Sequence, residues 1–391
     1  MPSRKIGKKP AKKKPVVKNR KIVLVGKANA RKSVTSARSV KSRTPSIMSA
    51  GASDATAGLN IRNKSAGVGL DVGTSNLVAA RVTEQGDESV VSRNAFLYVR
   101  EDETTKELLT RMNIPQQVIN GKVCVLGKNA FDFSNYFDRR TQRSMNIGVI
   151  NPLEREAIHV INLIVQKMLW KPRSPSEICS FSLPGQPVDS SIDITYHKNV
   201  IETMLSCFGY EPMAINEAFA VVLAELKDKK FTGVGISCGG GMVNVCVAYT
   251  SIVIAEFAIG RGGDWIDQHA ANAIDISVNK ILIAKEKGMS ILGPENREEE
   301  SIAIYYKQYI RYFLEQIAKV MHMPDKGVQF EEPVDMVFAG GSSMVGGFIE
   351  VVRRELKNVD LGIKINEVRM AAQPFYSVSK GCLLNAQMAS K

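Results

Sequence analysis

The sequence is poor in the residues that form disulfides or bind zinc, and it has no long apolar run. Its 391 residues include six cysteines and four histidines, whose spacing matches no disulfide framework or metal-binding motif. Such cysteines favour buried thiols in a reducing compartment. No apolar run approaches the roughly 18 residues of a membrane span. The sequence therefore predicts a cytoplasmic protein without a transmembrane segment.

Acidic residues are almost absent from the first part of the chain. Residues 1–64 hold 18 lysines and arginines but one acid, Asp54, so their net charge is +17. The rest of the chain has 34 basic and 38 acidic side chains, a net charge of −4. Residues 1–66, rich in Lys, Arg, Ser, Ala and Pro without periodicity, are predicted to be a disordered basic tail.

The tail is expected either to bind an anionic membrane surface or nucleic acid, or only to keep the protein soluble. Binding would place the protein beside the inner membrane or the nucleoid. The tail also contains a near match to a P-loop at residues 22–33. Arg31 stands where that motif needs glycine, and no domain-scale pattern surrounds it, so we do not interpret it as a P-loop.

The body is organised around a glycine turn in its centre. Two apolar runs, Val234–Cys238 and Met242–Ala248, flank Gly239, Gly240 and Gly241. β-branched runs joined by a short glycine turn are typical of a hairpin. Three glycines exceed the need of a tight turn and allow backbone N–H groups to approach an anion. Alone, the stretch is equally compatible with a glycine-rich hairpin without a ligand.

Two similar motifs lie before and after it. Residues 68–81 form a predicted strand, turn and strand, with Asp71 ahead of a turn made of Gly73, Thr74, Ser75 and Asn76. Residues 337–347 form a predicted strand that ends in Gly340, Gly341, Ser342 and Ser343 and opens a helix over 345–356. Further helices are predicted from the turn at 261–267 to about Lys287, and over 375–388.

Two glycine hairpins and a third glycine turn, in this order, resemble the superfamily of actins, heat-shock chaperones and sugar kinases from Gly67 to the C-terminus. The spacing is most similar to bacterial actins of the MreB and MamK types. The resemblance implies an α/β, two-domain actin-like ATPase fold, with duplicated ribonuclease H-like domains around a nucleotide cleft. Domain I would span 67–230, with an inserted subdomain at about 94–140 and completion by 375–391. Domain II would span 231–374.

The resemblance also implies roles for individual residues. The turns at 73–76 and 239–241 would hold the terminal phosphates of ATP, and Gly340 to Ser343 would lie under the nucleoside and α-phosphate. Asp71 would organise Mg²⁺ through water; it could instead simply cap a turn. Glu217, in the motif Ile215–Ala220, would orient the attacking water; it could instead compensate a helix dipole. Glu300 would lie on the adenine side.

The sequence departs from the superfamily pattern on both sides of the central glycines and on the adenine side. Ser237 stands where active members usually have an acid before the glycines. After the glycines, where those members have polar residues, this chain has Met242, Val243 and Asn244. On the adenine side, Ala303 replaces the lysine of a Glu-x-x-Lys pattern. The expected function is therefore a bacterial actin-like cytoskeletal protein that binds ATP and Mg²⁺, self-associates into filaments and hydrolyses ATP slowly. The alternatives are a non-polymerising nucleotide-binding scaffold or pseudo-ATPase, and a small-molecule kinase.

Overall fold

The computed structural model describes residues 66–114, 116–136, 141–324 and 330–390. Apart from Ala66, the predicted basic tail, with its P-loop-like segment, lies outside these residues. None of the described helices is long and apolar enough to cross a membrane. All six cysteines are free thiols, and only Cys207 is exposed, as their scattered spacing predicts.

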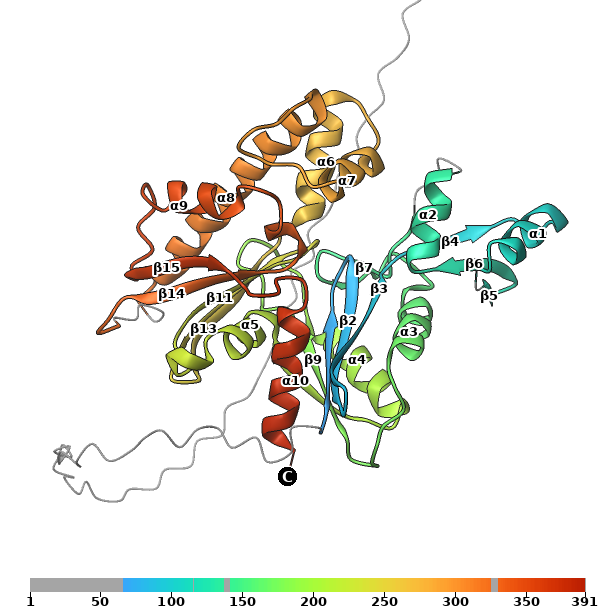
Figure 1. Cartoon of the computed structure of the whole chain (residues 1–391), viewed down its shortest axis with the longest axis horizontal. Coiled ribbons are helices and arrows are strands. Elements are labelled where there is room, and N and C mark those ends of the chain that lie inside the picture. Colours follow the sequence, from blue (N-terminus) through green and yellow to red (C-terminus); the bar gives the residue numbers. More distant parts are fainter. Residues whose placement is uncertain (1–65, 115, 137–140, 325–329, 391) are drawn as a thin grey trace, which may run out of the picture. The chain divides into compact units, whose positions relative to one another are not determined.

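The first half of the body is built on a five-stranded sheet in the order β10-β9-β1-β2-β3. The first three strands form an antiparallel meander, and two later strands add in parallel beside β1. The strands are β1 Val68–Val72, β2 Asn76–Thr83, β3 Gly86–Arg93, β9 Ile178–Leu183 and β10 Glu211–Asn216. Helices α3 (Ala157–Met168) and α4 (Thr195–Cys207) cover one face of this sheet, and α10 (Ser377–Ala389) covers the other (Figure 1).

The second half repeats this topology, in the order β13-β12-β11-β14-β15. An antiparallel meander again precedes two parallel strands. The strands are β11 Gly233–Cys238, β12 Val243–Tyr249, β13 Ile252–Ile259, β14 Val334–Ala339 and β15 Ile365–Met370. The repeated strand order confirms the predicted α/β fold with duplicated ribonuclease H-like halves.

Two helices pack against each other between the sheets. Helix α5 (Glu217–Glu225) follows the first sheet in the chain but packs on β11 and β12 of the second. Helix α10 follows the second sheet but packs on β1 and β9 of the first. The two helices are so close that a Cβ on Gly381 would lie 1.9 Å from the backbone oxygen of Ala220. A larger residue at 381 would push the helices apart.

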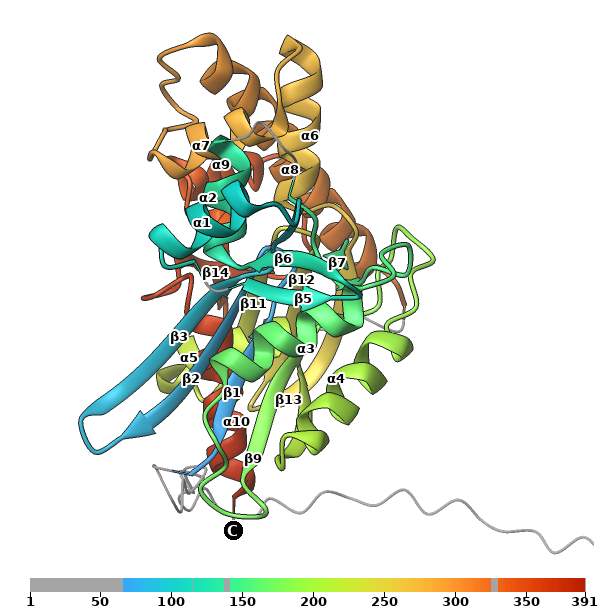
Figure 2. The same ribbon diagram turned by 90° about the vertical axis from the view of Figure 1, so that its right-hand side faces the viewer.

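A small additional unit follows the first meander. A three-stranded sheet, β4-β6-β5, packs with two helices around its own apolar cluster (Figure 2). Its elements are β4 Phe96–Val99, α1 Glu103–Arg111, β5 Gln116–Ile119, β6 Lys122–Leu126 and α2 Lys128–Tyr136. A two-stranded hairpin, β7 Met145–Asn146 with β8 Val149–Ile150, returns the chain to the first sheet.

The helices of the second half differ from the sequence prediction in two places. The predicted helix to Lys287 is divided into α6 (Gly263–Ile274) and α7 (Val278–Glu286), because Asp275 ends α6 in the left-handed conformation with φ 56°. The diglycine at 340–341 opens only a 3₁₀ turn over Gly341–Ser343, and α9 begins later and spans Phe348–Glu355. The long helix α8 spans Arg297–Met321, capped by Asn296.

Candidate functional site

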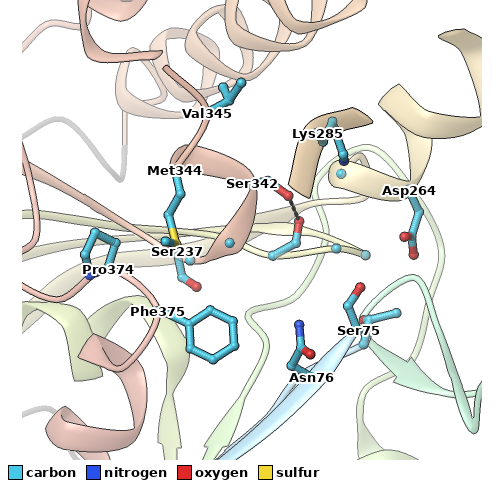
Figure 3. A pocket seen from close by; sticks show the side chains of 18 of the residues that line it. Ser75, Asn76, Ser237, Asp264, Lys285, Ser342, Met344, Val345, Pro374 and Phe375 are labelled. Carbon is cyan, nitrogen blue, oxygen red and sulfur yellow. Dashed lines mark hydrogen bonds between the residues drawn. The ribbon is translucent and has the colours of Figure 1, made fainter. Parts of the chain in front are cut away.

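A cavity of about 700 Å³ lies between the ends of the two sheets. Both predicted hairpin turns, the third glycine turn and the two predicted acids line it. Figure 3 shows Ser75 and Asn76 on one side, Met344 and Val345 opposite them, and Phe375 and Asp264 at the two ends. Every predicted site residue except Ser343 and Glu300 contributes to the walls: Asp71, Gly73, Thr74, Ser75, Asn76, Glu217, Gly239, Gly240, Gly241, Gly340, Gly341 and Ser342.

The turns of the two hairpins meet across this cavity. A Cβ on Gly240 would lie 2.2 Å from Ser75 Oγ, and a Cβ on Gly241 would lie 2.6 Å from Thr74 Oγ1. Within the described residues, the amides of Gly240 and Gly241 donate to no acceptor. Exposed amides in a turn without side chains form a concave surface that suits an anion.

The third glycine turn closes one side of the cavity. The hydroxyl of Ser342 donates to the carbonyl of Gly239 over 2.9 Å and so joins this turn to the central hairpin. Gly341 faces open space, since a Cβ there would meet nothing within 4 Å. Ser343 is buried and donates to Gly340 O instead of facing the cavity. Because α9 begins only at Phe348, the N-terminus of this helix does not lie at the turn.

The two predicted acids lie deep in the cavity. Asp71 is in β1, and Ser182 donates to its Oδ1 over 3.0 Å. Glu217 is the first residue of α5, whose N-terminus is capped by the Asn216 side chain. Burial raises the pKa of Glu217 to about 8, and the negative charge of Asp71 adds to this rise. Burial likewise raises the pKa of Asp71, so without a bound cation the pair favours holding a proton.

Two polar residues of the central hairpin contact Glu217. Asn244 Nδ2 donates to Glu217 Oε2 over 2.8 Å, and Ser237 Oγ donates to the same oxygen over 3.3 Å. Both residues are buried. Two of the positions that depart from the superfamily pattern, Ser237 and Asn244, thus provide hydrogen-bond donors to the predicted catalytic acid.

Two arginines at the cavity were not predicted from the sequence. Arg143 pairs with Asp264, and Arg93 pairs with Glu286. Arg93 is the last residue of β3 and Arg143 precedes β7, whereas Asp264 belongs to α6 and Glu286 to α7. All four side chains line the cavity. Only the turn that contains Asp264 had a sequence signal; nothing in the pattern around the arginines indicated their partners.

Glu300 is not part of this site. It is exposed on α8, whose buried face includes the adjacent Ser301 and Ile302. The preceding residues Glu298 and Glu299 instead line a neighbouring cavity of about 540 Å³, which shares Met289 with the first. The structure thus places Glu300 outside the walls of this cavity, with its side chain turned to solvent.

Comparisons with solved structures bear out the predicted fold. A MamK double helical filament has 18% sequence identity and a TM-score of 0.61, with 82% of this chain and 98% of the other covered. MreB5 of Spiroplasma citri bound to ADP has 14% identity and a TM-score of 0.55, with 80% and 94% covered. A non-polymerising MamK mutant bound to AMPPNP has 18% identity and a TM-score of 0.50, with 82% and 98% covered.

The likeness to these bacterial actins establishes an actin-like ATPase fold. No curated protein matches the chain. A family model described as Volactin matches residues 67–386, which is nearly the whole body. The chain therefore belongs to the volactin family.

Proposed function

We propose that this protein is an actin-like cytoskeletal ATPase that binds ATP with Mg²⁺ in the cavity and assembles into filaments. The observation that carries the proposal is the meeting of two glycine turns, one from each sheet, above the half-buried Asp71 and the buried Glu217. Anion-binding turns and acids so close together suit a ligand that brings both phosphates and a cation. A nucleotide with its magnesium ion is such a ligand.

The residues present fit this ligand. The space at Gly240 and Gly241 would be filled by any side chain, and their free amides suit the terminal phosphates. The nucleoside would lie against Gly341, Met344 and Phe375 at the other end of the cavity. Asp71 would hold Mg²⁺ through water, as this ion retains several waters and is bound partly through phosphates. When bound, the ion neutralises charge on the phosphates.

Glu217 would act on the attacking water. Its carboxylate is fixed at the start of a capped helix and receives two hydrogen bonds at Oε2. The other oxygen, Oε1, would accept a proton from water and orient it for in-line attack. Ser237 lacks the charge of a second carboxylate. The rate of hydrolysis should therefore be lower than the turnover of typical kinases, which is roughly 1–100 s⁻¹.

Filament formation is supported by the fold shared with the MamK filament structure. One observation favours the alternative of a nucleotide-binding scaffold without turnover, namely the neutral Ser237 beside Glu217. The basic tail would join the filament to an anionic membrane surface or nucleic acid in the cytoplasm.

Sedimentation of the full chain with Mg·ATP, Mg·ADP and no nucleotide, together with phosphate release, tests the proposal. We expect ATP-dependent pelleting with slow release of phosphate. ATP binding without pelleting would support the scaffold instead. Absence of nucleotide binding under all conditions would overturn the assignment.

A further inference from the structure

The buried side chain of Asn244 accepts one hydrogen bond and donates another. Its Oδ1 accepts from the backbone amide of Gly185 over 2.8 Å, and its Nδ2 donates to Glu217 Oε2 over 2.8 Å. The side chain is 1% exposed. A backbone N–H can only donate, so it fixes Oδ1 toward Gly185 and leaves Nδ2 for Glu217.

Ser237 strengthens the same arrangement from the neighbouring strand. Ser237 and Asn244 lie directly opposite each other in the β11–β12 pair, and both donate to Glu217 Oε2. Oε1 forms no hydrogen bond with any residue that the structure describes. Two donors on one oxygen therefore leave the other oxygen free to contact a water in the cavity.

The hydrogen-bond chain also joins the two halves of the body. Gly185 follows β9 of the first sheet, whereas Asn244 lies in β12 of the second. The segment after Gly185 lies along β13: Val188 N donates to Ala258 O, and Ala258 N donates to Gln186 O, each over 2.9 Å. A Cβ on Gly185 would lie 2.7 Å from the backbone carbon of Phe257, so this contact is close. The orientation of Asn244 thus depends on how this segment lies against the second sheet.

We propose that Asn244 is a positioning residue for Glu217, which fixes its carboxylate so that Oε1 faces the attacking water. The inference rests on the proposed function and names a residue that serves its reaction. Through Gly185, the orientation of Glu217 depends on the contact between the two halves. Hydrolysis then requires that the segment after β9 packs against β13. Nucleotide binding through the glycine turns does not require this packing.

The simpler reading of Asn244 is a buried amide whose hydrogen bonds only stabilise the fold. The two readings differ in what a substitution changes. A structural residue affects stability and nucleotide binding along with the rate. A positioning residue affects the rate alone. When it is removed, the carboxylate of Glu217 is still present in the cavity but lies in the wrong orientation.

The test compares Asn244→Ala with Asn366→Ala in the full chain. Asn366 offers an amide-to-carboxylate hydrogen bond of the same kind, from Nδ2 to Asp335 Oδ1 over 2.7 Å; it is exposed, and neither residue lines the cavity. Calorimetry gives the Mg·ATP dissociation constant, and single-turnover phosphate release gives the rate. We expect Asn244→Ala to keep the dissociation constant while the rate falls about 10- to 100-fold, the effect of a misplaced reacting group. Asn366→Ala should change neither.

Several results would overturn the inference. They are an unchanged rate in Asn244→Ala, an equal loss of binding and rate, or a wild-type protein that binds Mg·ATP for hours without hydrolysis. If Asn244→Ala fails to fold, Ser237→Ala removes the second donor to Oε2 and should lower the rate less strongly, again without weakening binding. A wild-type protein that binds no nucleotide would refute the proposed function itself, which separates the two failures.

Discussion

Arg143 and Asp264 form an ion pair at the wall of the cavity, in which one guanidinium nitrogen contacts both carboxylate oxygens. Arg143 Nη1 lies 2.6 and 2.7 Å from the two carboxylate oxygens of Asp264. Arg143 precedes β7 of the first half, and Asp264 lies in the first turn of α6 in the second. A partly buried charge pair of this geometry holds its two elements in one position. It should therefore slow the opening of the cavity.

The first prediction concerns this pair. Arg143→Gln should accelerate the release of bound ATP roughly 10-fold or more, because removing one partner of this partly buried pair acts mainly on dissociation. Stopped-flow release of a fluorescent ATP analogue measures the effect. Arg311→Gln breaks the exposed pair with Glu315 on α8 and serves as the control. Equal release rates in both variants would show that the Arg143 pair does not restrain the cavity.

The second prediction concerns turnover. Glu217→Gln keeps an acceptor for Asn244 but removes the group that takes the proton from water. Mg·ATP affinity should stay nearly unchanged, while hydrolysis falls by about 10²-fold or more, the usual scale for a positioned base. Calorimetry and single-turnover kinetics measure the two quantities. If the variant hydrolyses ATP at the wild-type rate, Glu217 has no catalytic role and serves only as the first residue of α5.

The third prediction follows from the raised pKa of Glu217. The folded protein without nucleotide keeps this proton up to about pH 8, whereas an unfolded chain releases it near the ordinary glutamate pKa of 4.5. The unfolded state therefore binds fewer protons between these values, and stability falls as the pH rises through this window. Glu217→Gln removes this loss. The free energy of unfolding of Glu217→Gln should exceed that of the wild type by more at pH 8 than at pH 5. The increase between these two pH values should be on the order of 3 kcal/mol.

Urea unfolding of both proteins without nucleotide, at pH 5 and pH 8, measures this difference. His197→Gln is a useful comparison at another buried titratable site. Burial lowers the pKa of His197 to about 4. His197 therefore lowers the stability of the wild type only as the pH falls below about 6.5, and it has no such effect at pH 8. A Glu217→Gln advantage that does not grow with pH would contradict the raised pKa.

The fourth prediction concerns the basic tail. Eighteen cationic side chains against one acid should bind polyanions mainly through release of counterions, so that affinity falls steeply with salt. Deleting residues 1–64 should abolish binding to anionic liposomes and to DNA while nucleotide binding persists. Co-sedimentation with each polyanion over a series of salt concentrations tests this. If the shortened protein binds both as tightly at low salt, the tail is not the binding element.

The fold and the central turns were predictable because their signals are local. Runs of β-branched residues around Gly239 to Gly241 indicate a hairpin, and β11 and β12 form it. The break at Asp275 was missed because apolar periodicity continues across it, and only one backbone conformation divides the helix. Strand β15 was missed because it lies at the sheet edge, is half polar and has one buried residue, Val368.

The rim of the site was not predictable, for a different reason. Arg143 and Asp264 are 121 residues apart in the sequence, and Arg93 and Glu286 are 193 residues apart. No local pattern connects such partners, and only the fold brings them together. Likewise, Asn244 was noted as a departure from a pattern, but its contact with Glu217 depends on how α5 packs on the second sheet.

The central claim is that the cavity between the glycine turns binds a nucleotide. Gly341 lines this cavity and faces open space, whereas a side chain at Gly240 would also clash with Ser75. Gly341→Leu should therefore fill the cavity without straining the fold, and Gly293→Leu, also in open space but outside this cavity, is the matched control. Calorimetric titration with Mg·ATP should give binding to the wild type and to Gly293→Leu, and no measurable binding to a folded Gly341→Leu. Equal affinity in all three proteins would contradict the account.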